Sequence, residues 1–201
     1  MEITRLRTLL DPHLERIVLP CCQGDTLSAI GNPSMIGARK LAIFCSVRCP
    51  GRLLIATYDL ARSLRDATVC VISGFHSPME KECLTILLSG QQPIVICLAR
   101  GFDGIRIPLA WREPLAQGRL LLLSACADNV RRPTVATAGS RNKVVAALAD
   151  RIFVAYADPG GKTERLLNEI LAWGKQVYTK SECSMNTRFL GGGHRDKTQA
   201  H

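Results

Sequence analysis

The stretch Ala138-Gly-Ser-Arg141-Asn142-Lys143 leads through Ala149-Asp-Arg-Ile-Phe-Val-Ala-Tyr156 to Asp158-Pro-Gly-Gly-Lys-Thr-Glu164. Its pattern predicts a helix with a basic start, then a buried strand, then a glycine turn that opens a second helix. In a parallel sheet this arrangement brings backbone N–H groups and cationic side chains to the carboxyl edge of the strands. A phosphate group would bind at that edge.

Outward from this stretch, short apolar runs alternate with longer amphipathic segments, a pattern typical of a mostly parallel sheet covered by helices. We predict strands over 41–46, 68–73, 93–98, 119–124, 151–156 and 176–178, and helices over 53–65, 139–149 and 161–173. A further helix starts at Ser77-Pro-Met-Glu80, which has the residues of a capped helix start, and stops at Gly90. Residues 106–117 receive no assignment because Pro108 and Pro114 interrupt them.

These elements predict an α/β fold, a Rossmann-like three-layer sandwich with a mostly parallel sheet of about six strands. We expect the domain to span residues 41–180. Residues 1–40 are expected to form an irregular N-terminal extension, with at most one or two short helices, that packs on the core. Residues 128–137 are expected to be a long polar loop. Residues 181–201 are expected to be a flexible basic tail.

The chain has 201 residues, a formal net charge of +9 and a pI near 9.3. This balance favours an anionic partner, although excess Lys and Arg also serve solubility alone. The amino terminus lacks the apolar core of a secretory signal, and no apolar run approaches the roughly 20 residues of a membrane span, so we expect a cytoplasmic protein. The nine cysteines are odd in number and several lie in apolar strands, which favours reduced core thiols.

Open parallel sheets bind ligands beyond the carboxyl ends of their strands, so the turns that follow the strands hold the candidate residues. The glycine turn 159–163 is not a Walker A loop, because Tyr156 stands where that motif needs a glycine, and an ordinary turn remains the alternative. Cations at the start of the 139–149 helix would be unfavourable unless an anion neutralises them, although a solvated basic face is the simpler alternative. The candidate phosphate-binding residues are Ser46, Arg48, Ser73, Gly74, Arg131, Arg132, Arg141, Asn142, Lys143, Gly160, Gly161, Lys162 and Thr163.

Two other kinds of chemistry are possible at this edge. A zinc ion could be held by Cys45, Cys49, His76 and Cys126, but no two of them have the spacing of a dedicated zinc knuckle. We therefore expect no metal and no cofactor. A hydrolase of glycosidic bonds could use a carboxylate beside the glycine turn, Glu164 or Glu169, together with an arginine.

Several segments, in consecutive order, resemble the DNA-processing protein A (Smf) family over roughly residues 25–180. They are Gly31-Asn-Pro-Ser-Met-Ile36, Lys40-Leu-Ala-Ile-Phe-Cys-Ser46, Val71-Ile-Ser-Gly74, Ile94-Val-Ile-Cys-Leu-Ala-Arg-Gly-Phe-Asp103, Leu122-Leu-Ser124, Arg141-Asn142 with Ala147-Leu-Ala-Asp150, and Gly174-Lys-Gln-Val-Tyr178. The sequence departs from the family pattern in two turns. Cys45 replaces a glycine in the first, Val47 takes the place of its arginine unless Arg48 serves by a shift of one, and Phe75 begins the segment that replaces the small, glycine-rich run of the second.

The resemblance implies binding of single-stranded DNA by the residues named above, mainly through the DNA backbone. It also implies a homodimer and contact with a recombinase. The wider superfamily includes the LOG nucleotide hydrolases, whose glycine motif is similar to 159–163. That similarity implies an alternative function as a nucleotide sensor or phosphoribohydrolase, with Arg141 and Glu164 or Glu169 as the catalytic pair. We favour a DNA-binding protein over an enzyme.

Overall fold

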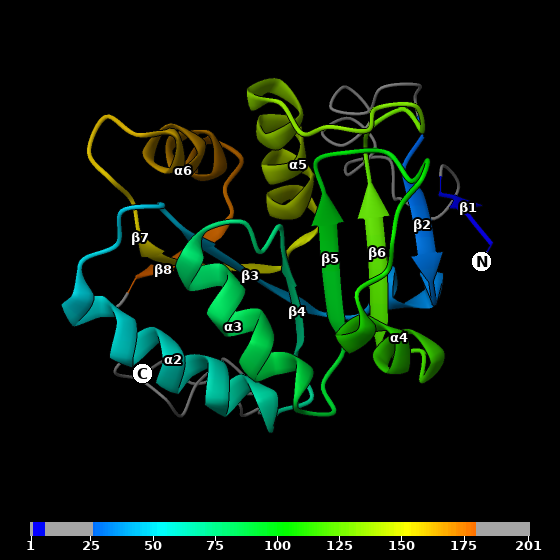
Figure 1. The fold of residues 1–201 in the computed structure, drawn as a ribbon. Coiled ribbons are helices and arrows are strands. Elements are labelled where there is room, and N and C mark those ends of the chain that lie inside the picture. Colours follow the sequence, from blue (N-terminus) through cyan, green and yellow to red (C-terminus); the bar gives the residue numbers. More distant parts are fainter. Residues whose placement is uncertain (1, 7–25, 180–201) are drawn as a thin grey trace, which may run out of the picture.

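The computed structural model describes residues 2–6 and 26–179, which form an eight-stranded sheet with helices on both faces (Figure 1). The strands are β1 (Thr4–Arg5), β2 (Ser28–Gly31), β3 (Lys40–Cys45), β4 (Cys70–Ser73), β5 (Ile94–Leu98), β6 (Leu120–Ser124), β7 (Arg151–Tyr156) and β8 (Gln176–Thr179). Their order across the sheet is β1-β2-β6-β5-β4-β3-β7-β8. The predicted α/β class is confirmed, with more strands than expected.

The strands from β3 to β8 run parallel, and their connections create one reversal of strand order. The chain places β4, β5 and β6 outward from β3 in one direction. It then returns across the sheet and places β7 on the other side of β3, with β8 beyond it. The order therefore reverses between β3 and β7, and in open parallel sheets ligands bind beyond the carboxyl ends of the strands at such a point.

The helices divide between the two faces of the sheet. They are α2 (Gly51–Arg65), α3 (Pro78–Leu88), α4 (Leu109–Ala116), α5 (Val135–Leu148) and α6 (Lys162–Ala172), with a short 3-10 helix, η2 (Pro33–Gly37). Apolar residues of α2 and α3 pack on one face, and those of α5 and α6 pack on the other. Figure 1 shows α2 and α3 on the side of the sheet away from α5 and α6.

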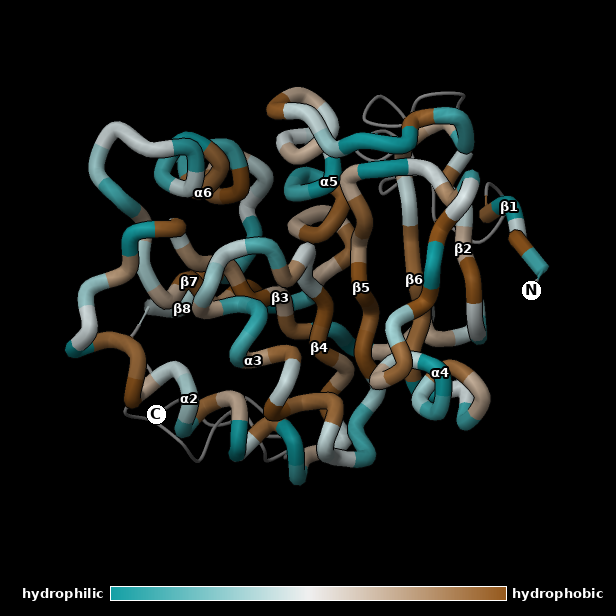
Figure 2. Tube along the Cα trace, in the orientation of Figure 1, coloured by the Kyte–Doolittle hydropathy of each residue, from teal (hydrophilic) through white to brown (hydrophobic). Residues whose placement is uncertain are grey.

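The central strands contribute to both apolar layers. In the run Leu120-Leu-Leu-Leu123, alternate side chains belong to opposite layers and all four are fully buried. A parallel strand covered on both faces needs no polar position, so the run is continuously apolar. Figure 2 shows the same apolar character along β5 and β6.

Residues 26–40 are more regular than the sequence suggested. Strand β2 pairs antiparallel with β6, with Ala29 opposite Leu123, and β1 pairs antiparallel with β2. The expectation of an irregular segment with only short helices is therefore wrong at β1 and β2. The rest of that extension, residues 7–25, and the predicted tail over 181–201 lie outside the described residues.

Helix α5 begins at Val135, four residues before the predicted start at 139. Thr134 caps the helix, because its hydroxyl accepts a hydrogen bond from the N–H of Thr137 at 3.1 Å and the Thr137 hydroxyl accepts one from the N–H of Thr134 at 2.9 Å. The predicted polar loop therefore ends at Thr134. Residues 106–117, which received no assignment, contain α4, with Pro108 at its N-cap and Pro114 inside it.

None of the helices in the described part of the chain has the length and apolar character that a membrane span requires.

Candidate functional site

The turns after β3 and β7 are joined directly at the point where the strand order reverses. The backbone N–H of Ser46 donates to the carbonyl of Tyr156 at 2.8 Å. The Ser46 hydroxyl accepts a hydrogen bond from the N–H of Asp158 at 2.9 Å. Ser46 is nearly buried, so it fixes the two turns to each other and its backbone is not available to a ligand.

Helices α2 and α6 start beside this junction, and neither has a side-chain cap. Pro50 is the N-cap residue of α2 and Gly161 is that of α6, and no side chain hydrogen-bonds to the first turn from either position. The first backbone N–H groups of a helix have no partner inside it, and they carry the positive end of the helix dipole. Both helices therefore direct the positive ends of their dipoles, without a side-chain cap, to the carboxyl edge of the sheet, and such helix starts bind phosphate in other proteins.

Cationic side chains lie at these two helix starts. Arg48 is exposed in the turn before α2, and Lys162 is exposed at the first position of α6. The Glu164 carboxylate accepts a hydrogen bond from the N–H of Gly160 at 2.7 Å and holds the glycine turn in shape. Within the described chain, the N–H groups of Lys162 and Thr163 make no hydrogen bond, so they remain open to an anion.

The turn between β4 and α3 is closed by the protein itself. Glu80 is only 6% exposed, and its carboxylate accepts hydrogen bonds from the N–H groups of His76 at 2.7 Å, Cys45 at 2.9 Å and Ser77 at 3.3 Å. The Ser77 hydroxyl completes the predicted helix start by accepting from the N–H of Glu80 at 3.3 Å. Burial raises the pKa of the Glu80 carboxyl, while these backbone donors and the Arg141 charge oppose the rise. An internal carboxylate therefore fills the place at which this turn could bind a phosphate.

Two residues of this turn have structural roles. The Ser73 side chain is fully buried, and its hydroxyl donates to the carbonyl of Ile43 at 2.8 Å and accepts from the N–H of Phe75 at 3.2 Å. Phe75 has a φ of 45°, in the left-handed region that favours glycine, and it is the one non-glycine residue with positive φ among the described residues. The resemblance noted a glycine-rich run here, and Phe75 keeps a glycine-like backbone while its ring enters the core.

Arg141 lies in the seventh position of α5 and not at its start, so the predicted conflict between its charge and a helix start is wrong. The side chain is 6% exposed, and one guanidinium nitrogen donates to the carbonyl of Gly74 at 3.3 Å. A Cβ atom at Gly74 would lie 2.0 Å from a guanidinium nitrogen, so only glycine allows this close approach. Burial lowers the pKa of Arg141, and the nearby Glu80 charge opposes this. Arg141 is therefore a buried support of the β4 turn.

The remaining basic candidates are distributed over α5 and the loop before it. Lys143 forms an ion pair with Glu169 of α6 at 2.7 Å. Asn142 is half-buried, while Arg131 and Arg132 are exposed in the loop that precedes α5. These residues belong to other elements than Arg48 and Lys162, which lie in the turn before α2 and at the start of α6.

The alternative catalytic pair is not assembled among the described residues. Glu169 is paired with Lys143, and Glu164 is bound to the N–H of Gly160. Within the same residues, no ion pair connects Arg141 with either carboxylate. Each acid therefore has another partner.

The four residues that could hold zinc differ in their exposure to solvent. Cys45 and Cys126 are buried, Cys49 is half-buried and His76 is exposed. Burial raises the pKa of the Cys45 and Cys126 thiols, which disfavours the thiolate form that binds metal. In residues 2–6 and 26–179, no group of three or more His, Cys, Asp or Glu residues is placed to hold a metal ion.

Glu80 and the start of α2 are the parts of the site that sequence analysis missed. The capping position of Glu80 was predicted, but its contact with Cys45 comes from a distant strand and leaves no local pattern. The segment Cys49-Pro-Gly51 contains no Ser, Thr, Asp or Asn before the helix, and this absence could have indicated an uncapped start.

The fold is similar to solved structures of DNA processing protein A. The Streptococcus pneumoniae protein superposes with a TM-score of 0.69 at 17% sequence identity, over 89% of this chain and 63% of that one. The Helicobacter pylori protein, whose structure concerns its single-stranded DNA binding mode, superposes with a TM-score of 0.69 at 19% identity, over 89% of this chain and 80% of that one. The chain thus spans less than two thirds of the S. pneumoniae protein.

A comparison with curated proteins gives no match. The sequence model of the DNA recombination-mediator protein A family matches residues 20–199, which is most of the chain. The chain therefore belongs to the DNA recombination-mediator protein A family.

Proposed function

We propose that this protein binds single-stranded DNA through the uncapped starts of α2 and α6. The contacts would come from the side chains of Arg48 and Lys162 and from the backbone N–H groups of Lys162 and Thr163, with Ser46 holding the two turns together. The N–H groups of Gly160 and Gly161 are already bound by Glu164 and Asp158, so these glycines would shape the turn. The observation that carries the proposal is that two helices, one on each face of the sheet, lack side-chain caps at the point where the strand order reverses. Two helix dipoles and two cations then act on the same phosphates.

The composition supports contacts to the DNA backbone over stacking on bases. Four of the five phenylalanines, Phe44, Phe75, Phe102 and Phe153, are buried in the core. Binding of single strands by stacking requires exposed aromatic rings, so these residues cannot contribute. With a net charge of +9, we expect affinity that is largely independent of base sequence and falls with salt.

Two further points support a DNA ligand over a nucleotide substrate. The related H. pylori protein binds single-stranded DNA, and the fold is shared. Glu164 and Glu169, the carboxylates that a phosphoribohydrolase would use, each hold another group. Arg131 and Arg132 would extend the basic surface along the strand. A homodimer, a recombinase partner and a cytoplasmic location belong to the same proposal.

Fluorescence anisotropy with a labelled strand of about 20 nucleotides, at about 50 and 200 mM salt, tests the proposal. The variant R48A/K162A should bind roughly tenfold more weakly, and the slope of log affinity against log salt should fall by about 1 for each lost phosphate contact. Arg39→Ala is the single-charge control, because Arg39 is exposed just before β3 at the opposite edge of the sheet. Absence of binding at low salt would contradict the proposal. An equal loss of DNA affinity in R39A and in the single variants R48A and K162A would also contradict it.

A further inference from the structure

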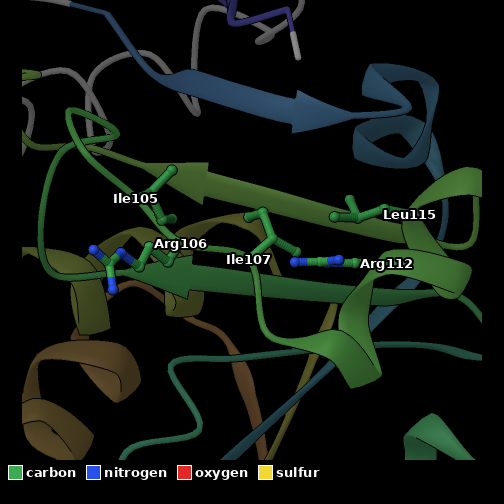
Figure 3. Close-up of a pocket in the computed structure, with 5 residues that line it drawn as sticks. All are labelled: Ile105, Arg106, Ile107, Arg112 and Leu115. Carbon is green, nitrogen blue, oxygen red and sulfur yellow. The ribbon is translucent and has the colours of Figure 1, made fainter.

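A groove of about 580 Å³ lies between the segment that follows β5 and helix α4 (Figure 3). Its lining residues are Ile105, Arg106, Ile107, Arg112 and Leu115. The three aliphatic residues are half-buried and pack against the core, while the two arginines are exposed. In Figure 3, Arg112 extends from α4 toward Ile107. The groove therefore combines an apolar floor with two cationic side chains.

The connection from β5 to β6 covers its face of the sheet with a shorter helix than the neighbouring connections do. Helices α2 and α3 are 15 and 11 residues long, whereas α4 has 8 residues and lies at the amino ends of β5 and β6. Residues 99–108 replace the missing helical turns, and in this segment residues 105–108 have no regular secondary structure. Leu109, the first residue of α4, is 79% exposed. The side chains of β5 and β6 beneath this connection are buried, so the apolar surface that a ligand could reach belongs to the connection itself.

The backbone beside the groove is also unpaired. The N–H of Ile105 donates to the carbonyl of Phe102, but the N–H and carbonyl groups of Arg106 and Ile107 make no hydrogen bond with any other described residue. An extended peptide can pair with such a segment through its own backbone, as in recognition by strand addition. Within the described residues, Arg106 and Arg112 also have no hydrogen-bond or ion-pair partner.

We propose that this groove binds an acidic, aliphatic-rich segment of another protein in an extended conformation. Its backbone would pair with Arg106 and Ile107, its aliphatic side chains would cover Ile105, Ile107 and Leu115, and its carboxylates would contact the two arginines. Charge complementarity selects this occupant. A second copy of this chain, with a net charge of +9, would bring further cations to the arginines.

Single-stranded DNA fits the groove less well than such a peptide. Three of the five lining side chains are aliphatic, and they offer a DNA strand neither a charge for its phosphates nor an aromatic ring for its bases. The groove also reaches the amino edge of β5 and β6, whereas α2 and α6 start at the carboxyl edge of β3 and β7. Figure 1 shows α4 at the lower end of β5 and β6, far from the turns at the left that precede α2 and α6.

A labelled peptide of alternating glutamate and isoleucine, blocked at both ends, tests the inference on the full chain by anisotropy. The wild-type protein should bind it, and should not bind the matched peptide of lysine and isoleucine. The variant R106A/R112A should weaken binding at least roughly tenfold, as expected for loss of charged hydrogen bonds. The control R39A/R62A loses the same charge elsewhere and should change binding less than twofold, since Arg62 lies on α2 in an exposed pair with Asp59.

A second variant distinguishes backbone pairing from attraction of charge alone. Ile107→Pro removes one backbone donor and should weaken peptide binding, whereas Ile107→Val keeps the donor and should bind almost as well. Thermal unfolding of each variant separates a lost contact from a lost fold. The inference is overturned if the acidic peptide does not bind, if R106A/R112A matches its control, or if R106A/R112A instead weakens DNA binding or changes the oligomeric state. It stands independently of the DNA proposal, because the two sites have no residue in common.

Discussion

Helices α3 and α5 begin with capping boxes, whereas α2 and α6 begin with no side-chain cap. All four helices follow parallel strands of the same sheet, so each of them starts at the carboxyl edge, where a ligand could bind. At α3 the donors are satisfied by Ser77 and Glu80, and at α5 by Thr134 and Thr137. Because only α2 and α6 lack a side-chain cap among these four helices, anions should bind at the junction of β3 and β7. Basic residues alone would not indicate this place, since they also occur at several other turns.

The largest effect should come from opening the closed turn. Glu80→Ala removes an acceptor for three backbone N–H groups and the buried negative charge nearest Arg141. Because unsatisfied buried donors cost about 1–3 kcal/mol each and do not add fully, we expect unfolding in urea to show a loss of about 3 kcal/mol. Glu80→Gln keeps one oxygen acceptor and should lose less.

The same variant also tests whether the start of α3 takes part in DNA binding. If α3 contributes nothing to DNA binding, folded Glu80→Ala protein should bind the strand within about twofold of wild type, a difference well below 1 kcal/mol. A large rise in affinity would show that the emptied turn accepts a phosphate. A loss of stability below about 1 kcal/mol would show that the Glu80 hydrogen bonds contribute little.

Much of the fold could be predicted because apolar runs and helix starts are local. The boundaries of β7 agree with the predicted strand, and Gly174 has the positive φ expected after the end of α6. Strand β2 was missed because Ser28-Ala-Ile-Gly31 is short and contains small residues, and it becomes a strand through pairing with β6. The early start of α5 was missed because Gly139 and Ser140 are weak helix formers, and the Thr134 cap compensates for them.

The candidate site was predictable in position but not in detail. The sequence placed Ser46, Gly160 and Lys162 on one sheet edge, where the structure brings their turns together. It did not reveal that Arg141 is buried against Gly74, because that contact depends on how α5 crosses the sheet. The sequence around an arginine on a packed helix does not show whether its side chain is buried or exposed. The role of Arg141 therefore became clear only from the tertiary structure.

A smaller effect is expected from converting an open helix start into a closed one. Pro50→Asp places a carboxylate at the N-cap of α2, where it would cap the first turn of the helix and repel a phosphate. We expect DNA affinity to fall roughly threefold to tenfold, about 1 kcal/mol, with unchanged or slightly higher stability of the helix. The matched variant Pro50→Ser adds a neutral cap and should reduce affinity less. Equal affinity in both variants and wild type would show that α2 does not contact DNA.

The smallest effect should come from Lys143, a basic candidate that the structure pairs with Glu169. Both side chains are about two-fifths exposed, and such surface pairs contribute about 0–1 kcal/mol, so Lys143→Gln should change the free energy of unfolding by no more than about 0.5 kcal/mol. DNA affinity should fall less than in Lys162→Gln, because the Glu169 charge already neutralises Lys143 while Lys162 stands at an open helix start. Anisotropy with both variants at low salt measures the difference. If Lys143→Gln loses as much affinity as Lys162→Gln, the phosphate path runs along α5 as well, and the distinction between open and capped helix starts does not define the DNA-binding surface.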